Sequence, residues 1–155
     1  MRINLKKGFT LIELIIVIAI IGILASIVLT QLSQARIRGS DAAVKSNLDN
    51  IRSQIALYFS NNADSYGSWN SGSQGNCPTS STPGTGMFSD SNILNAITAA
   101  INAGGNGSSC VTTGSAYAVA VGMKTSGQSW CIDSTGKSKQ YASAPASAIA
   151  SAACL

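Results

Sequence analysis

The sequence predicts an α+β fold in which one long N-terminal α-helix packs on a small, disulfide-stapled head with a short antiparallel β-sheet. Residues 9–29 form an apolar run with a single charge, Glu13, and apolar residues then continue at helical spacing. The remainder is rich in Ser, Gly, Asn and Thr and carries the 4 cysteines. At 155 residues, the chain has material for one domain with a modest core.

The apolar run is long enough to cross a bilayer, since a helix over residues 9–29 spans about 30 Å. Three basic residues, Arg2, Lys6 and Lys7, precede it. The positive-inside rule therefore predicts a single-pass membrane precursor with a cytoplasmic N-terminus and its C-terminal part outside. The cysteines then lie on the oxidising side.

The net charge of +4 does not indicate a specific nucleic-acid partner. Without the three leader charges, 7 of the 10 basic residues remain against 6 acidic ones. Arg36, Arg38 and Lys45 alternate with Asp41 and Asp49, so we interpret them as a solvated helix face rather than a binding patch.

Glu13 is unusual, because a carboxylate within a membrane span is costly and is usually paired or functional. A cleaved secretory signal has a shorter apolar core and no acid near its start. A plain membrane anchor explains the length but not Glu13. A third interpretation places Glu13 close enough to the interface to reach water.

The segment KKGFTLIELIIVIAIIGILASI resembles the N-terminus of class III signal-sequence proteins, the type IV pilins and the type II secretion pseudopilins. A short basic leader ends in Gly8, Phe9 follows, and a carboxylate stands fifth in the remaining chain. The resemblance is close over residues 1–36 and loose beyond. It implies that prepilin peptidase recognises the leader charges, cuts between Gly8 and Phe9, and leaves a Phe9 amino group that is N-methylated.

The resemblance also gives Glu13 a partner, the freed ammonium of Phe9 in a neighbouring subunit, which would set the register between subunits. Many relatives carry a proline near the end of the apolar half, where this chain has Thr30. Gly22 and Ser26 are then the positions of weakest helix propensity. The implied organisation is a cleaved leader (residues 1–8), a hydrophobic helix (9–36), its amphipathic continuation (37–62) and a head (63–155).

The implied function is a structural subunit of a surface filament for adhesion, motility or DNA uptake. Its implied partners are further copies of itself, prepilin peptidase, an assembly ATPase and an inner-membrane platform protein. The alternatives are a type II secretion pseudopilin, a minor pilin, or a membrane-anchored surface protein that does not polymerise. No histidine exists, and no convergent acids or bases indicate catalysis, so we expect no enzyme activity, cofactor or metal site.

Apolar spacing extends the helix from about Phe9 to about Asn62. The stripe consists of Val44, Leu48, Ile51, Ile55 and Tyr58. Residues 61–90 lack an apolar period and are predicted to form a loop. A short helix is predicted over residues 89–102, capped by Asp90 or Ser91 and stopped by Gly104 and Gly105.

Alternation at Tyr117, Val119 and Val121, followed by SWCID, predicts a β-hairpin with a further strand near Tyr141. The Ala/Ser-rich tail is expected to be ordered only if Cys154 tethers it. Four cysteines allow three disulfide pairings, and sequence alone does not choose among them. The pairing we favour is Cys77–Cys110 with Cys131–Cys154.

Overall fold

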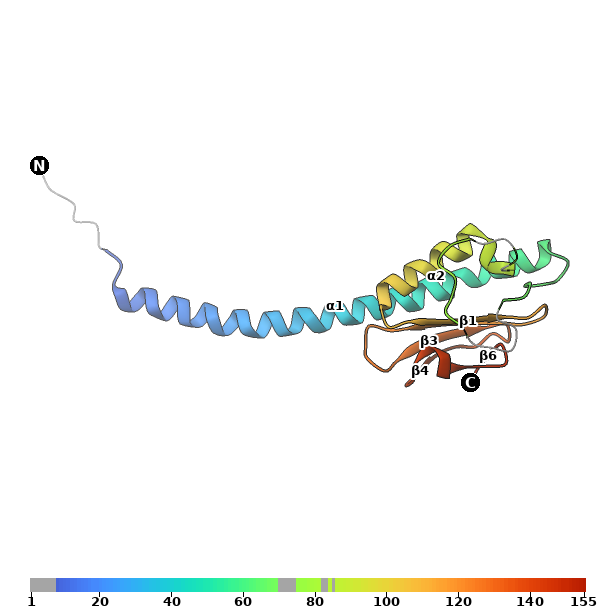
Figure 1. Ribbon diagram of the computed structural model, residues 1–155. Helices are drawn as coiled ribbons and strands as arrows, with labels where there is room; N and C mark the ends of the chain where they lie inside the picture. Colours follow the sequence, from blue (N-terminus) through green and yellow to red (C-terminus); the bar gives the residue numbers. More distant parts are fainter. Residues whose placement is uncertain (1–7, 70–74, 82–83, 85) are drawn as a thin grey trace, which may run out of the picture. The chain divides into compact units, whose positions relative to one another are not determined.

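The computed structural model describes residues 8–69, 75–81, 84 and 86–155. The order of elements is α1 (Leu11–Asn61), the 3-10 helix η1 (Gly86–Ser89), α2 (Ser91–Gly104), β1 (Ser108–Thr112), β2 (Tyr117–Gly122), β3 (Ser129–Asp133), β4 (Ser138–Tyr141), the 3-10 helix η2 (Pro145–Ala148), β5 (Ile149–Ala150) and β6 (Ala153–Cys154) (Figure 1). The chain divides into two compact units between Arg36 and Ile37. The predicted α+β class is confirmed.

Helix α1 supplies one wall of the head through its C-terminal part. The predicted stripe is correct: Val44, Leu48, Ile51 and Ile55 are buried. Asp41 is buried beside them and accepts hydrogen bonds from the backbone N–H groups of Lys124, at 2.6 Å, and Thr125, at 3.2 Å. Because a buried carboxylate must be hydrogen-bonded, Asp41 fixes this turn of the helix to the β2–β3 loop.

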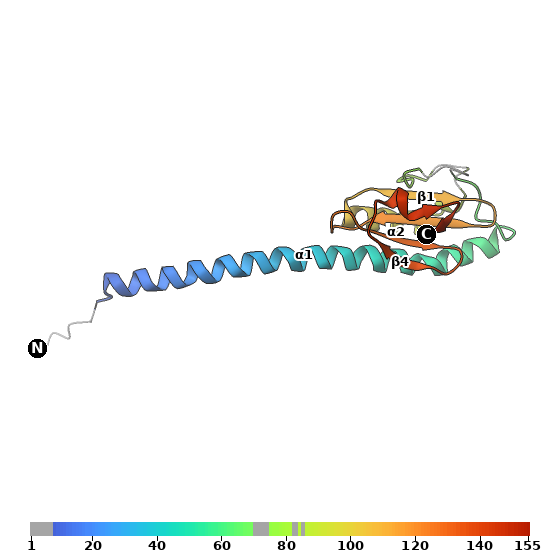
Figure 2. The same ribbon diagram turned by 90° about the horizontal axis from the view of Figure 1, so that it is seen from below.

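The head has three layers, with a four-stranded antiparallel sheet in the middle (Figures 1 and 2). The strand order is β1-β2-β3-β4, so each strand pairs with the next along the chain. Tyr117, Val119 and Val121 of β2 join the cluster that contains the α1 and α2 residues. Ala118 and Ala120 face the opposite way and join the cluster formed with the C-terminal segment.

Helix α2 confirms the predicted short helix and its caps. The Asp90 carboxylate accepts from the backbone N–H groups of Asn92, at 2.9 Å, and Ile93, at 3.2 Å, and so caps the N-terminus. Gly105 closes the helix in the left-handed conformation at φ 74°. A Cβ on Gly104 would lie 1.8 Å from the carbonyl oxygen of Gly122, so only glycine permits this approach of α2 to β2.

The long predicted loop is more ordered than its composition indicates. Trp69 and Gly75 form isolated β-bridges with Thr112 and Cys110 of β1, a strand that the sequence pattern does not predict. A disulfide joins Cys77 to Cys110, and Met87 and Phe88 of η1 are fully buried. The described part of residues 61–90 therefore covers the outer edge of the sheet and completes the core, because the free edge of β1 needs hydrogen-bond partners.

The C-terminal tail is ordered by specific contacts. A disulfide joins Cys131 to Cys154, and Ala148, Ile149 and Ala152 are buried against the alanine face of the sheet. The Asp133 carboxylate accepts the Cys154 N–H at 2.8 Å. The two disulfides are the pairs favoured from the sequence, and the tethering that the tail requires is present.

Asp133 makes the stability of the head depend on pH. Its side chain is 1% exposed, and burial acts to raise its pKa. Hydrogen bonds from the Thr135 hydroxyl and from backbone N–H groups outweigh that effect and lower the pKa below its usual value. A lowered pKa contributes stability above the unfolded-state pKa of about 3.9, and the contribution is lost as the pH falls through the folded-state pKa.

We therefore expect Asp133→Asn to lower the free energy of unfolding at pH 7 and to reduce its fall between pH 5 and 2, since the neutral amide has no charge to lose. Denaturant unfolding of the full chain in micelles at a series of pH values measures this. Asp64→Asn is the matched control, because Asp64 is exposed and its side chain makes no hydrogen bond with other described residues. Identical pH profiles for the two variants would contradict the assignment.

Candidate functional site

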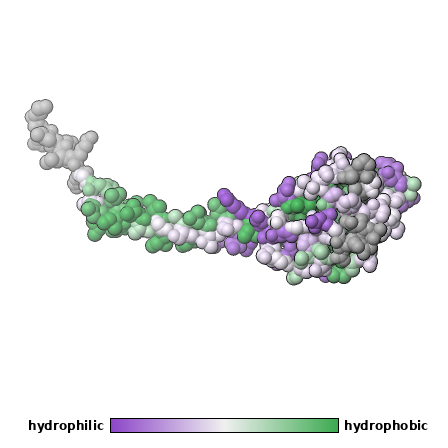
Figure 3. Space-filling model, in the orientation of Figure 1, coloured by the Kyte–Doolittle hydropathy of each residue, from purple (hydrophilic) through white to green (hydrophobic). Residues whose placement is uncertain are grey.

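The N-terminal unit exposes apolar side chains on every side of α1. From Phe9 to Leu29 each large apolar side chain is at least 45% exposed, and Phe9 reaches 77%. Figure 3 shows this hydrophobic surface in green. By length and composition, α1 is able to cross a membrane. A surface of this kind requires cover by lipid or by other protein, because exposed apolar area is unfavourable in water.

Glu13 is held by Thr10 at the first turn of α1. Its Oε2 atom accepts the Thr10 N–H at 2.8 Å and the Thr10 hydroxyl at 2.7 Å. The Glu13 N–H donates in return to the Thr10 hydroxyl oxygen at 3.3 Å. This reciprocal pair is a capping box, with Thr10 as the N-cap and Glu13 three residues later.

The capping box gives Glu13 a partner within its own chain, which we did not predict. The pattern Thr10-Leu11-Ile12-Glu13 carries the signal, since a Thr followed three residues later by Glu before an apolar run marks a helix start. The second carboxylate oxygen, Oε1, has no hydrogen-bond partner among the described residues. One oxygen is thus fixed and the other is free to meet a cation.

The predicted cleavage residues lie just before the helix. Gly8 and Phe9 precede α1 and are exposed, and a Cβ placed on Gly8 would meet no atom within 4 Å. The nitrogen of Phe9 is a peptide amide in the uncut chain, so the expected ammonium forms only after cleavage. The leader charges Arg2, Lys6 and Lys7 lie outside the described residues.

The helix continues through its positions of weak propensity. Ser26 donates its hydroxyl to the Gly22 carbonyl at 2.9 Å, and Thr30 donates to the Ser26 carbonyl at 3.1 Å. These bonds satisfy polar side chains without an external partner. α1 is unbroken at Thr30, because threonine keeps the backbone N–H that proline lacks.

The four cysteines lie outside this unit and form the two disulfides of the head. Across residues 8–69, 75–81, 84 and 86–155, no group of three or more His, Cys, Asp or Glu residues is placed to hold a metal ion.

We expect Thr10→Val to loosen the first turn of α1 by about 1 kcal/mol, because valine has the shape of threonine but cannot cap. Amide hydrogen exchange at residues 11–14, measured on the full chain in micelles, should become faster. Thr30→Val is the control, since the Thr30 hydroxyl bonds only within the helix. Unchanged exchange in Thr10→Val would show that the capping box contributes nothing to helix formation.

Comparisons with known proteins find a methylation motif and a similarity to type IV pilins. Residues 3–29 match the family model of the prokaryotic N-terminal methylation motif. The chain is 48% identical over 58 residues to the type IV wide pilus major component PilA4 of Thermus thermophilus. The aligned residues make up 37% of this chain and 44% of that protein. It is 48% identical over 52 residues to the type IV major fimbrial protein FimA of Dichelobacter nodosus. That alignment covers 34% of this chain and 33% of FimA.

The chain thus matches less than half the length of these curated relatives. No solved structure matches it significantly. The family-model match covers the apolar run and its Thr10–Glu13 cap. Residues beyond it form an α+β head with two disulfides. The N-terminal segment thus carries the prokaryotic N-terminal methylation motif, and the chain is similar to type IV pilins over about a third of its length.

Proposed function

We propose that this protein is the structural subunit of a type IV pilus-like surface filament that serves adhesion, motility or DNA uptake. The observation that carries the proposal is the apolar surface of residues 9–29, which begins at Phe9 directly after Gly8 and is interrupted by one carboxylate. In the precursor, lipid covers this surface. In the filament, the same surface of neighbouring subunits replaces the lipid, so no apolar area returns to water.

Cleavage prepares the subunit for this exchange. Prepilin peptidase cuts after Gly8 at the cytoplasmic face and leaves the apolar segment attached to the head. The new Phe9 ammonium, once N-methylated, retains its positive charge. The assembly ATPase and the platform protein of the inner membrane then supply the work of extraction. The mature head is extracellular on the filament.

Glu13 meets the Phe9 ammonium of a neighbouring subunit through its free Oε1 atom. The Thr10 contacts already fix the other oxygen at 2.8 and 2.7 Å, so the carboxylate is oriented before assembly. A buried ion pair is stable only when both charges are paired and well oriented, and losing one partner costs about 3–5 kcal/mol. The pair therefore selects one register between neighbouring helices.

The mass of the intact chain from sheared surface filaments tests the proposal. We expect a chain that begins at Phe9 and is heavier by one methyl group. It should also gain four hydrogens on reduction, because the head holds the disulfides Cys77–Cys110 and Cys131–Cys154. A chain found only in membranes and still beginning at Met1 would contradict the proposal and favour an anchored surface protein.

Glu13→Gln separates the charge of Glu13 from its capping role. Glutamine also serves at this position of a capping box, so the helix start should stay intact. We expect normal membrane insertion and more than about a tenfold loss of sheared filament protein, since the buried Phe9 ammonium loses its partner. Thr30→Val is the matched control, because it removes a hydroxyl from the same helix and leaves Glu13 and its cap intact. Wild-type filament yield from Glu13→Gln would show that no such ion pair is needed.

A further inference from the structure

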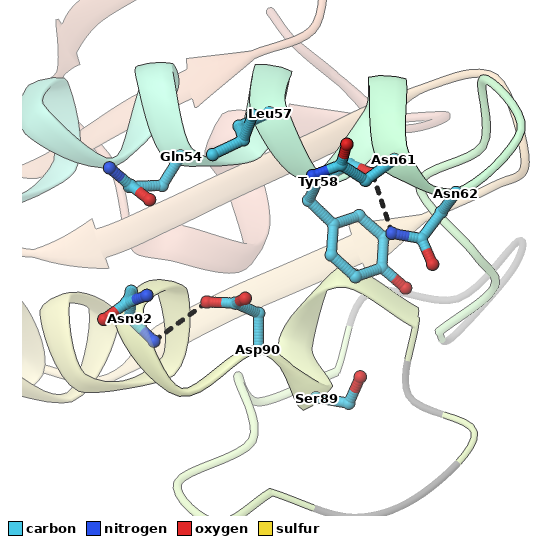
Figure 4. A pocket seen from close by; sticks show the side chains of 8 residues that line it. All are labelled: Gln54, Leu57, Tyr58, Asn61, Asn62, Ser89, Asp90 and Asn92. Carbon is cyan, nitrogen blue, oxygen red and sulfur yellow. Dashed lines mark hydrogen bonds between the residues drawn. The ribbon is translucent and has the colours of Figure 1, made fainter.

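A pocket of about 370 Å³ opens in the head between the C-terminal end of α1 and the N-terminal end of α2 (Figure 4). This volume lies within the range of small-molecule sites. The lining residues come from both helices and from η1: Gln54, Leu57, Tyr58, Asn61, Asn62, Ser89, Asp90 and Asn92.

Three amide side chains in the lining are available to a ligand. The side chains of Gln54, Asn61 and Asn92 have no hydrogen-bond partner among the described residues. Each presents two N–H donors and a carbonyl acceptor. By contrast, the Asn62 amide donates to the Tyr58 carbonyl at 2.8 Å and holds the end of α1 in shape. The pocket therefore offers both donors and acceptors that no other described residue uses.

An apolar surface lies beside these amides. Leu57 is 55% exposed, and between Ile37 and Cys154 it is the one large apolar side chain exposed among the described residues. The neighbouring residue, Tyr58, also lines the pocket, and its ring lies between α1 and α2 (Figure 4). A single exposed leucine is ordinary, but one beside an aromatic ring and free amides gives a pocket with an apolar side and polar groups around it.

The charges of the pocket exclude an anionic ligand. Among the described residues, no lysine or arginine lines it, and its one acid is Asp90. The Asp90 carboxylate already occupies the N-terminus of α2 through its bonds to Asn92 and Ile93. The partial positive charge of the helix is thus taken up, and a phosphate or carboxylate would meet a like charge.

We propose that this pocket binds a neutral saccharide. A sugar ring presents hydroxyl groups that both donate and accept, which suits the amides of Gln54, Asn61 and Asn92. Its C–H face is apolar and packs against an aromatic or aliphatic side chain, which suits Tyr58 and Leu57. The site belongs to the head alone, so binding by the unassembled chain is tested separately from filament formation.

The test is a titration of the full chain in dodecylphosphocholine micelles, whose headgroup is not a sugar. Glucose, galactose and N-acetylglucosamine are added, and the side-chain amide signals of Gln54, Asn61 and Asn92 are followed by ¹H–¹⁵N NMR. We expect saturable shifts at these amides. Asn92→Asp should weaken binding about fivefold or more, because it removes the amide N–H donors of Asn92 without a steric change.

Asn92→Asp should fold, because an acid in the first turn favours a helix and the Asn92 backbone N–H bond to Asp90 remains. The matched control is Asn95→Asp, an exposed position on the same helix outside the pocket lining, where binding should be unchanged. The absence of saturable shifts, or equal affinity of Asn92→Asp and wild type, would overturn the proposal. Stronger binding of N-acetylneuraminic acid or of a Gly-Ser peptide would overturn the neutral-saccharide assignment.

Discussion

The organisation of this chain depends on one constraint: the first half of α1 is apolar on every side and must be covered. In hydrocarbon, a helix also has to satisfy the N–H groups of its own first turn, since no water is present. The Thr10–Glu13 capping box meets part of that need, because it pairs the N–H groups of Thr10 and Glu13 within the chain. Glu13 thus has a local reason to be present, and the same geometry leaves its Oε1 atom for a charge supplied from outside.

The head solves a different problem, because it has few large apolar residues. Both faces of its sheet are covered, and the small side chains of Ala118 and Ala120 let the C-terminal segment approach closely. One disulfide ties the covered edge at β1, and the other ties the tail to β3. Each closes a loop of more than 20 residues, which the chain-entropy model values at about 3 kcal/mol or more. In this core, disulfides and close backbone packing supply stability that large apolar side chains provide in other domains.

Periodicity in the sequence predicted α1, α2 with its caps, and the hairpin of β2 and β3, because in each the apolar spacing reflects one buried face. It missed β1, which is short and holds two serines, and whose pairing with β2 is set by the hairpin rather than by alternation. It also missed the burial of Met87 and Phe88, which depends on contacts with other elements. The tail shows no apolar pattern, because its alanine residues are buried only through contact with the small side chains of the sheet.

The site residues divide in the same way. Gly8, Phe9 and Glu13 lie close together in the sequence, so their motif can be recognised from the sequence alone. The same holds for the capping pattern beside it, which we did not predict. The pocket is not local, because its α1 and α2 residues meet only once the two helices pack on the sheet. The residues proposed to meet a neighbouring subunit are consequently predictable from sequence, and those that line the pocket are not. The reason is physical: the proposed filament contact would use one continuous helix, whereas the surface of the head is assembled from segments that are distant in the sequence.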